Sequence, residues 1–198
     1  TRAAVVLDAV GLHTRGLLSR HAFERAARKL DELPAASSTE LRQKAGSNGS
    51  VRVTAAIHER ALFPRGLSDW AVVGGRAVFV GDLNVDVAGP FGAGEVFSGT
   101  FRWAHNRPKV GFGLAVPELG PLPGVTRFEG LWERQTYAIA ATDALALLET
   151  RQRMGIEVGD WATSWLAWQA GTAFDRFSER NNIAVNAGLD LRLLDDVL

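Results

Sequence analysis

From about Gly81 onward, apolar and polar residues alternate along the chain in one run after another. Side chains of a strand point to opposite faces of a sheet in turn, whereas helical residues repeat every 3.6 positions. Segments rich in Gly, Pro, Asn or Asp separate the runs at residues 90–94, 105–108, 120–124 and 159–160. Such compositions are typical of turns. The pattern predicts an antiparallel meander of about seven strands whose two faces differ in polarity.

The first 60 residues show a different pattern, with both helical and strand-like spacing of apolar residues. A short apolar stretch ending at Gly11 and an amphipathic stretch that begins after Ser19 and ends at Pro34 predict two helices. Two alternating runs, 39–44 and 51–58, flank a Gly-Ser-Asn-Gly turn and predict a hairpin. We therefore expect a small α+β module ahead of the meander.

Composition excludes several classes of protein. The chain has 22 basic and 22 acidic residues, no cysteine and 46% hydrophobic residues. A strongly basic nucleic-acid binder, a disulfide-rich miniprotein and a cysteine-based metal or redox site are disfavoured. No uninterrupted apolar run approaches the ~20 residues that a membrane-spanning helix needs. A membrane protein built from strands remains possible.

Alternation by itself fits both a soluble sandwich or lipocalin-like barrel and a membrane barrel. Three features favour the membrane barrel. The alternating runs are about ten residues or more, which matches a tilted strand that crosses a bilayer. The face opposite the apolar one carries charges of both signs and glycines, as a wet barrel interior would. Aromatic residues lie toward strand ends, where a girdle would place them: Trp103, Trp132, Tyr137 and Trp161.

No catalytic motif occurs in the sequence. A phosphate-binding loop, a zinc-binding His-Glu-x-x-His helix and a Gly-x-Ser-x-Gly nucleophile elbow are all missing. Glu129 and Glu133 share a strand face, but about 13 Å of strand rise separates them, which is too far for paired-carboxylate hydrolysis. The histidines lack metal-ligand spacing: His13, His21, His58 and His105. We expect no enzyme activity, no cofactor and no metal.

The order of these features resembles a known family. Residues 19–34, followed by a hairpin that ends in Val-Thr-Ala-Ala-Ile-His-Glu-Arg60, look like the second helix and last two strands of a POTRA domain. Residues 81–94, two strands around His105, and a strand end at Val116-Pro117 resemble the opening of the barrel in outer-membrane assembly proteins of the BamA/TamA type. The sequence departs from that family in having Val-Pro-Glu at this strand end and Leu33-Pro34 where many POTRA domains have Gly-x-Phe.

The resemblance implies an architecture and a location. Residues 1–62 would form a partial POTRA-like domain, and residues 69–198 would form the first strands of an incomplete transmembrane β-barrel in the bacterial outer membrane. Because the chain begins with Thr-Arg and ends in an alternating run, we expect it to be a piece of a longer protein. How many POTRA domains and barrel strands the parent protein has stays open.

The resemblance also implies a function. In the family, the first barrel strand pairs with client proteins that are being inserted or secreted, and POTRA edges offer further strand templates. The corresponding strand here is Leu83, Asn84, Val85, Asp86, Val87 and Ala88. The residues expected to face lipid are Val110, Phe112, Leu114, Val116, Met154 and Ile156. Expected partners are the outer-membrane bilayer, unfolded outer-membrane proteins and periplasmic subunits, and no nucleic acid.

Two alternatives stay open at this point. A soluble or periplasmic β-rich module that binds a ligand or a protein would use the same apolar face as its core. A barrel of the same family could instead translocate an attached passenger domain.

Overall fold

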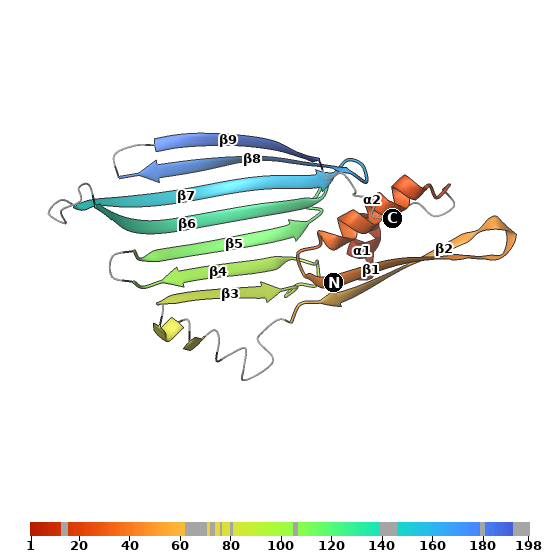
Figure 1. Cartoon of the computed structure of the whole chain (residues 1–198), viewed down its shortest axis with the longest axis horizontal. Coiled ribbons are helices and arrows are strands. Elements are labelled where there is room, and N and C mark those ends of the chain that lie inside the picture. The colour runs from red at the N-terminus through yellow and green to blue at the C-terminus, as the bar shows by residue number, and fades with distance from the viewer. Residues whose placement is uncertain are drawn as a thin grey trace.

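The computed structural model describes residues 1–12, 16–61, 71, 74–75, 77–79, 81–104, 107–138, 146–178 and 181–191. Within these residues the chain forms helices α1 and α2, further helical residues at 71, 74–75 and 77–79, a two-stranded sheet and a seven-stranded sheet. All strand pairs are antiparallel. The fold is therefore α+β and mostly β, and the large sheet is a meander, as the alternation predicted (Figure 1).

Both predicted helices are present, although the second ends at Asp31, before the predicted stop at Pro34. Helix α1 spans Ala3–Val10, and Gly11 follows it in the left-handed conformation, with φ of 61°. Helix α2 spans Arg20–Asp31, and the Ser19 hydroxyl accepts a hydrogen bond of 3.1 Å from the Ala22 amide. This side chain satisfies one of the amide groups that a helix start leaves unpaired.

The predicted hairpin is also confirmed. Strands β1 (Ala36–Ala45) and β2 (Val51–Glu59) are joined by a short 3-10 turn, η1, at Ser47–Gly49. Leu41, Ala55 and Ile57 pack against the small core that the helices form. That core is built from five buried residues: Ala9, Val10, Ala26, Leu30 and Leu33. We refer to α1, α2, β1 and β2 together as the N-terminal module.

The large sheet runs in chain order from one edge to the other. Its strands are β3 Asp82–Ala88, β4 Val96–Arg102, β5 Lys109–Pro117, β6 Val125–Ala138, β7 Ala146–Trp161, β8 Leu166–Phe177 and β9 Asn181–Leu191. Among the described residues, β3 and β9 each pair with a single neighbour, so the sheet is open. The N-terminal module lies at one end of the strands (Figure 1).

Two details of the strand prediction are wrong. Strands β3 and β4 have only 7 residues each, because the Pro-Gly-rich turn at 90–94 and the loop after Arg102 end them early. Gly159-Asp160 is not a turn: both residues lie in β7, where Gly159 pairs with Val125 and Gln169. The chain reverses at 162–165, where the Thr163 hydroxyl accepts a hydrogen bond of 3.0 Å from the Leu166 amide.

A single glycine lets the β5–β6 turn approach strand β7. Gly124 has φ of +70°, and a Cβ atom there would run into the carbonyl oxygen of Gly159. Only a residue without a side chain tolerates both conditions at low cost.

The boundary that the sequence predicts between the two segments, residues 62–69, lies outside the described residues. No helical segment in the described part of the chain is long and apolar enough to cross a membrane.

The module's core gives the first prediction. Leu30 is fully buried, whereas Leu17 is fully exposed. Replacing Leu30 with Ala leaves a cavity, so we expect the free energy of unfolding of the module to fall by about 2–5 kcal/mol. Leu17→Ala, the matched control, should change it by less than about 0.5 kcal/mol. Urea unfolding followed by helical circular dichroism measures both, and equal effects of the two substitutions would refute this account of the core.

Candidate functional site

The strand register gathers the apolar residues of the sheet onto one face. Residues that lie directly opposite each other in neighbouring antiparallel strands point to the same side. One row across this face is Val85, Gly99, Phe112, Gly130, Met154, Phe174 and Ile183. The next is Val87, Phe97, Leu114, Phe128, Ile156, Thr172 and Val185. We call this surface the apolar face; it contains all six residues predicted to face lipid.

Several large side chains on the apolar face are exposed, and others, such as Leu114, Phe128 and Ile156, are half-buried. Phe112 is 59% exposed, Met154 65% and Val185 80%. The sheet is a single layer in Figure 1, and the hydrophobic core formed by buried residues lies in the N-terminal module. The Phe112 ring lies over Gly130 so closely that a Cβ atom at position 130 would collide with it. Strand β5 alone carries apolar side chains over about 20 Å between Val110 and Val116.

Polar side chains appear on this side of the sheet at the end of the strands farthest from the N-terminal module. There one row consists of Leu83, Phe101, Val110, Trp132, Gln152 and Arg176. Trp103 follows Phe101, with ring centroids 5.6 Å apart. Trp103 is 45% exposed and Trp132 36%. Two of the four predicted girdle aromatics therefore lie where the apolar band meets polar side chains.

Trp161 does not take an outward girdle position. It is only 2% exposed, and its indole N–H donates a hydrogen bond of 3.0 Å to Glu32 of α2. The register explains the difference, because Trp161 falls in the alternate set of β7 positions, on the face opposite Met154. Tyr137 also occupies a position of that alternate set, and its side chain lies outside the described residues.

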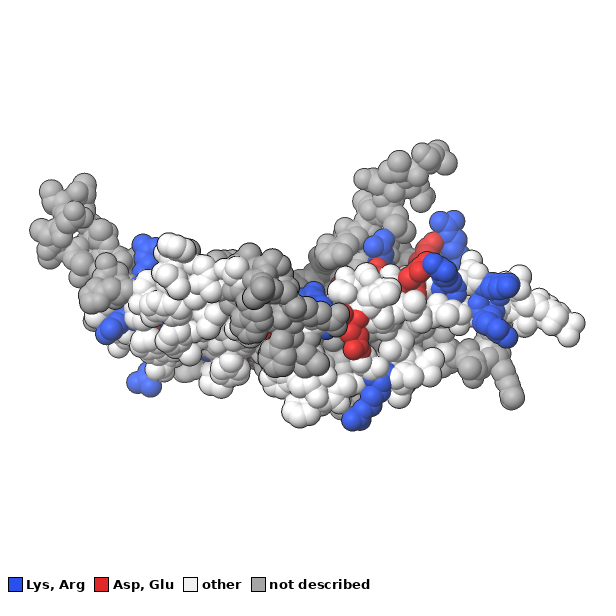
Figure 2. Space-filling view, turned by 90° about the horizontal axis from the view of Figure 1, so that it is seen from below, with Lys and Arg blue, Asp and Glu red and all other residues white. Residues whose placement is uncertain are grey.

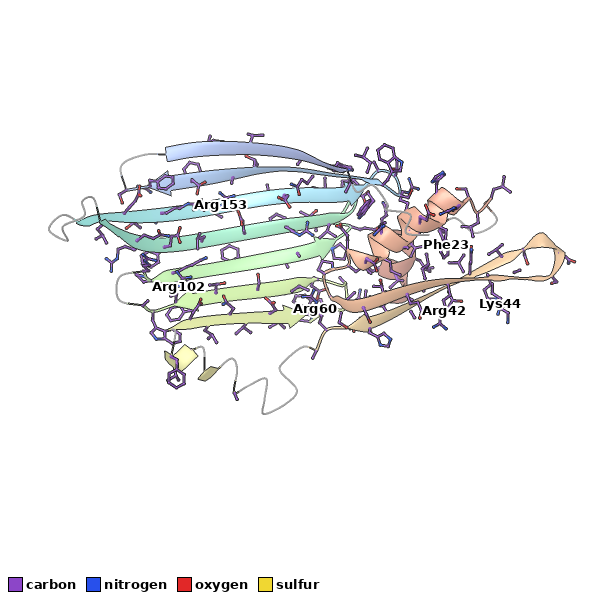
Figure 3. The ribbon with its side chains drawn as sticks, viewed as in Figure 1. Phe23, Arg42, Lys44, Arg60, Arg102 and Arg153 are labelled. Carbon is purple, nitrogen blue, oxygen red and sulfur yellow. The ribbon has the colours of Figure 1, made fainter. Side chains whose placement is uncertain are left out.

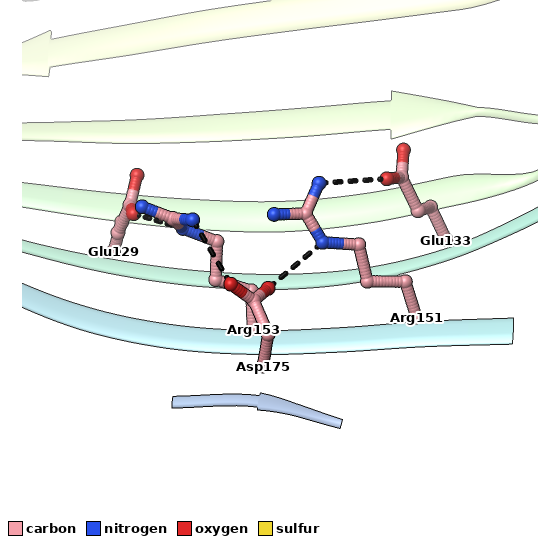
Figure 4. Close-up of polar contacts among 5 residues, drawn as sticks. All are labelled: Glu129, Glu133, Arg151, Arg153 and Asp175. Carbon is pink, nitrogen blue, oxygen red and sulfur yellow. Dashed lines mark hydrogen bonds and ion pairs between the residues drawn. The ribbon is translucent and has the colours of Figure 1, made fainter. Parts of the chain in front are cut away.

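The opposite face of the sheet, which we call the polar face, carries an ion-pair network across β6, β7 and β8 (Figure 4). Asp175 accepts hydrogen bonds from Arg151 at 2.8 Å and from Arg153 at 3.1 Å. Arg153 also reaches Glu129 at 2.5 Å, and Arg151 reaches Glu133 at 3.5 Å. Asp175 is 6% exposed and Glu133 8%, so the network is partly desolvated. Charge-assisted hydrogen bonds of this kind hold neighbouring strands in one register.

This network occupies the carboxylates that could otherwise suggest hydrolysis. Glu129 and Glu133 each pair with a different arginine and do not face each other (Figure 4). Among the residues that the structure describes, no group of three or more His, Asp or Glu side chains is placed to hold a metal ion.

Strand β3 forms an edge of the large sheet. It pairs with β4 from Asp82↔Arg102 to Ala88↔Val96, and no other described strand adjoins it. Asn84, Val85 and Asp86 are exposed, whereas Ala88 is buried. All six residues predicted as a strand template therefore lie on an edge strand, whose outward backbone groups are available for pairing.

The charged residues along one side of helix α2, its charged stripe, attach it to the end of β7 and to the turn between β7 and β8. Lys29 forms an ion pair of 2.8 Å with Asp160, and the Arg28 guanidinium lies 5.7 Å from the Trp161 ring centroid. Nearer the helix start, Arg25 donates to the Ala162 carbonyl oxygen at 3.3 Å. Sequence reasoning missed this contact, since a charged helix face normally meets solvent. One feature of the sequence could have revealed the contact: four charged residues recur at helical spacing, namely Arg25, Arg28, Lys29 and Glu32.

Beside the Lys29–Asp160 ion pair the module and the sheet pack closely. A cavity of about 20 Å³ lies there, lined in part by Lys29, Glu118 and Asp160. This volume accommodates about one water molecule. Burial raises the pKa of Glu118 above its usual value, and Asp8 nearby acts in the same direction. Two larger hollows adjoin this contact, one of about 270 Å³ between Glu32 and Gln169 and one of about 430 Å³ between Arg25 and Trp165.

No protein-family model matches the sequence, and no curated protein matches it either.

The ion-pair network gives the second prediction. Asp175→Asn removes the charge that Arg151 and Arg153 share, so we expect the free energy of unfolding of the sheet to fall by about 1–3 kcal/mol. The control is Glu157→Gln, because Glu157 pairs with Arg127 at 3.7 Å and both side chains are more exposed. Its loss should stay below about 0.5 kcal/mol. Urea unfolding in detergent measures both values; similar losses would show that the network adds nothing beyond ordinary surface pairs.

Proposed function

We propose that this chain is the POTRA-like and first-strand portion of an outer-membrane β-barrel protein that inserts, assembles or secretes other proteins. Strand β3 acts as the backbone template for client strands. The single observation that carries this proposal is the continuous apolar face of the sheet, on which large side chains such as Phe112, Met154 and Phe174 stay exposed.

The exposure of the apolar face supports lipid as its neighbour. A soluble sandwich would bury this face against a second sheet about 10 Å away. Contiguous exposed apolar surfaces on soluble proteins rarely exceed a few hundred Å². The aromatic and polar row around Trp132 supports the same assignment, since Trp and Tyr concentrate where hydrocarbon meets headgroups.

The edge position of β3 supports the template role. In hydrocarbon every backbone amide must be paired, so an unpaired strand edge gains much from receiving another strand. At this edge, backbone N–H and C=O groups of β3 would bind the incoming strand. The side chains of Leu83, Val85 and Val87 would face lipid. The N-terminal module, held at one end of the strands by α2, would lie on the periplasmic side and offer its own edges to clients or partner subunits.

Membrane contact is tested by an arginine placed on each face. Phe112→Arg puts a charge on the apolar face, where it costs about 2–4 kcal/mol near a bilayer midplane. Ser98→Arg adds the same charge on the polar face, where Ser98 lies opposite Gly113, the residue after Phe112. We expect Phe112→Arg to lose most of the bound fraction in flotation with phosphatidylcholine vesicles, and Ser98→Arg to keep it.

The alternative function predicts a different result. If the chain is a soluble binding module, it will remain a monomer without detergent and unfold cooperatively. Both arginine variants will then float equally poorly. That outcome would refute the membrane assignment.

The template role is tested by disulfide crosslinking, which has no background because the chain contains no cysteine. Asn84→Cys lies on the edge strand, and Thr100→Cys lies directly opposite it in β4, one strand further in. An added client strand would lie about 5 Å from position 84 and about 10 Å from position 100. With an unfolded outer-membrane barrel protein that carries one cysteine in its last strand, we expect crosslinks at position 84 well above those at 100. Equal yields would argue against strand addition at β3.

A further inference from the structure

The outer half of the β1–β2 hairpin is basic. Residues 41–54 contain Arg42, Lys44 and Arg52 and no acidic residue, although acidic and basic residues balance over the whole chain. All three side chains are exposed. We call these three residues the basic hairpin face.

Two of these positive charges lie on directly opposed residues of the hairpin. Lys44 lies directly opposite Arg52 in the strand register. Like charges at such positions destabilise a strand pair. Arg42 pairs with Glu40, but no ion pair to Lys44 or Arg52 occurs among the described residues. The facing Lys44 and Arg52 therefore destabilise the hairpin. A role of these charges in binding a partner would explain why both are basic.

The basic hairpin face points away from the module's core. Register places Arg42, Lys44 and Arg52 on one side of the hairpin, and Leu41 and Ala55, which pack against the core near α2, on the other. Figure 3 shows Arg42 and Lys44 next to each other along the hairpin. The hairpin projects beyond the helices, away from the large sheet and roughly along its strand direction (Figure 1). Charged side chains gather at this end of the molecule (Figure 2).

We propose that the basic hairpin face binds an acidic segment of a protein partner. Charge complementarity selects an acidic ligand. The choice of protein over lipid rests on the proposed function: if the large sheet spans the bilayer, a hairpin that continues outward along the strands carries its charges into the aqueous phase. Strand β1 has 10 residues, so the hairpin is about 33 Å long. Such a length would hold the basic side chains farther from the bilayer surface than the ~8 Å screening length at physiological ionic strength. Attraction to lipid headgroups would therefore be weak there.

The test compares two variants that remove the same net charge. Lys44→Gln with Arg52→Gln neutralises the basic hairpin face, and Arg107→Gln with Arg134→Gln removes two exposed charges from the opposite end of the large sheet. Binding of a fluorescent poly-glutamate peptide to the full chain in detergent is followed by anisotropy at low salt. We expect the hairpin variant to bind about tenfold more weakly. The distal variant should stay within about twofold of the parent chain.

A second readout separates binding from folding. Removing the facing charges should leave the unfolding midpoint of the module unchanged or higher, so weaker binding together with a lower midpoint would overturn the proposal. Equal losses in the two variants, or no peptide binding by the parent chain, would also overturn it. So would reduced binding of phosphatidylglycerol vesicles by the hairpin variant with unchanged peptide binding, which would assign the face to lipid. Peptide binding needs no bilayer, so its result is independent of the flotation experiment.

Discussion

The alternation of side chains along the strands of one open sheet is the constraint on which the other features depend. Because neighbouring strands are in antiparallel register, each alternate position joins a row that crosses the sheet. One set of rows brings Phe112, Gly130 and Met154 together, and the other brings Glu129, Arg153 and Asp175 within reach of one another. A shift of one residue in any strand would exchange the faces. The exposed apolar face and the charged network are therefore two results of the same register.

The contact of α2 with the end of β7 and the turn that follows it gives the molecule its second constraint. Lys29 and Asp160 lie far apart in sequence, yet their ion pair is largely buried, with side chains 22% and 9% exposed. The Trp161 indole is covered by the helix and bonded to Glu32. A buried pair and a buried aromatic resist separation more than exposed charges do. The helix therefore holds the N-terminal module at one end of the strands, with the hairpin directed away from the sheet.

Sequence reasoning predicted the elements well where the signal is local. Ser19, Gly11 and the apolar spacing of α2 predicted the helices because capping and amphipathicity act within a few residues. It failed for Gly159-Asp160, because strand β8 continues the ladder through both residues and this pairing overrides the local turn composition. It also failed for Trp161. Its place at the end of β7 suggested a girdle position, but the alternation of side chains along β7 puts it on the polar face. The pairing of Asp175 with two arginines could not be predicted, because it depends on register across three strands.

The sequence alone determined the order and type of the elements and the existence of two faces of opposite polarity. These properties follow from residue periodicity and turn chemistry, which act over short stretches of chain. Only the tertiary structure decided which residues share a row, that β3 is an edge strand, and that the charged stripe of α2 meets Asp160 and Trp161 instead of solvent. Such relations depend on residues far apart in the sequence, 131 positions in the case of Lys29 and Asp160. Their contacts form only when the register of the sheet and the docking of the helix fix them in space.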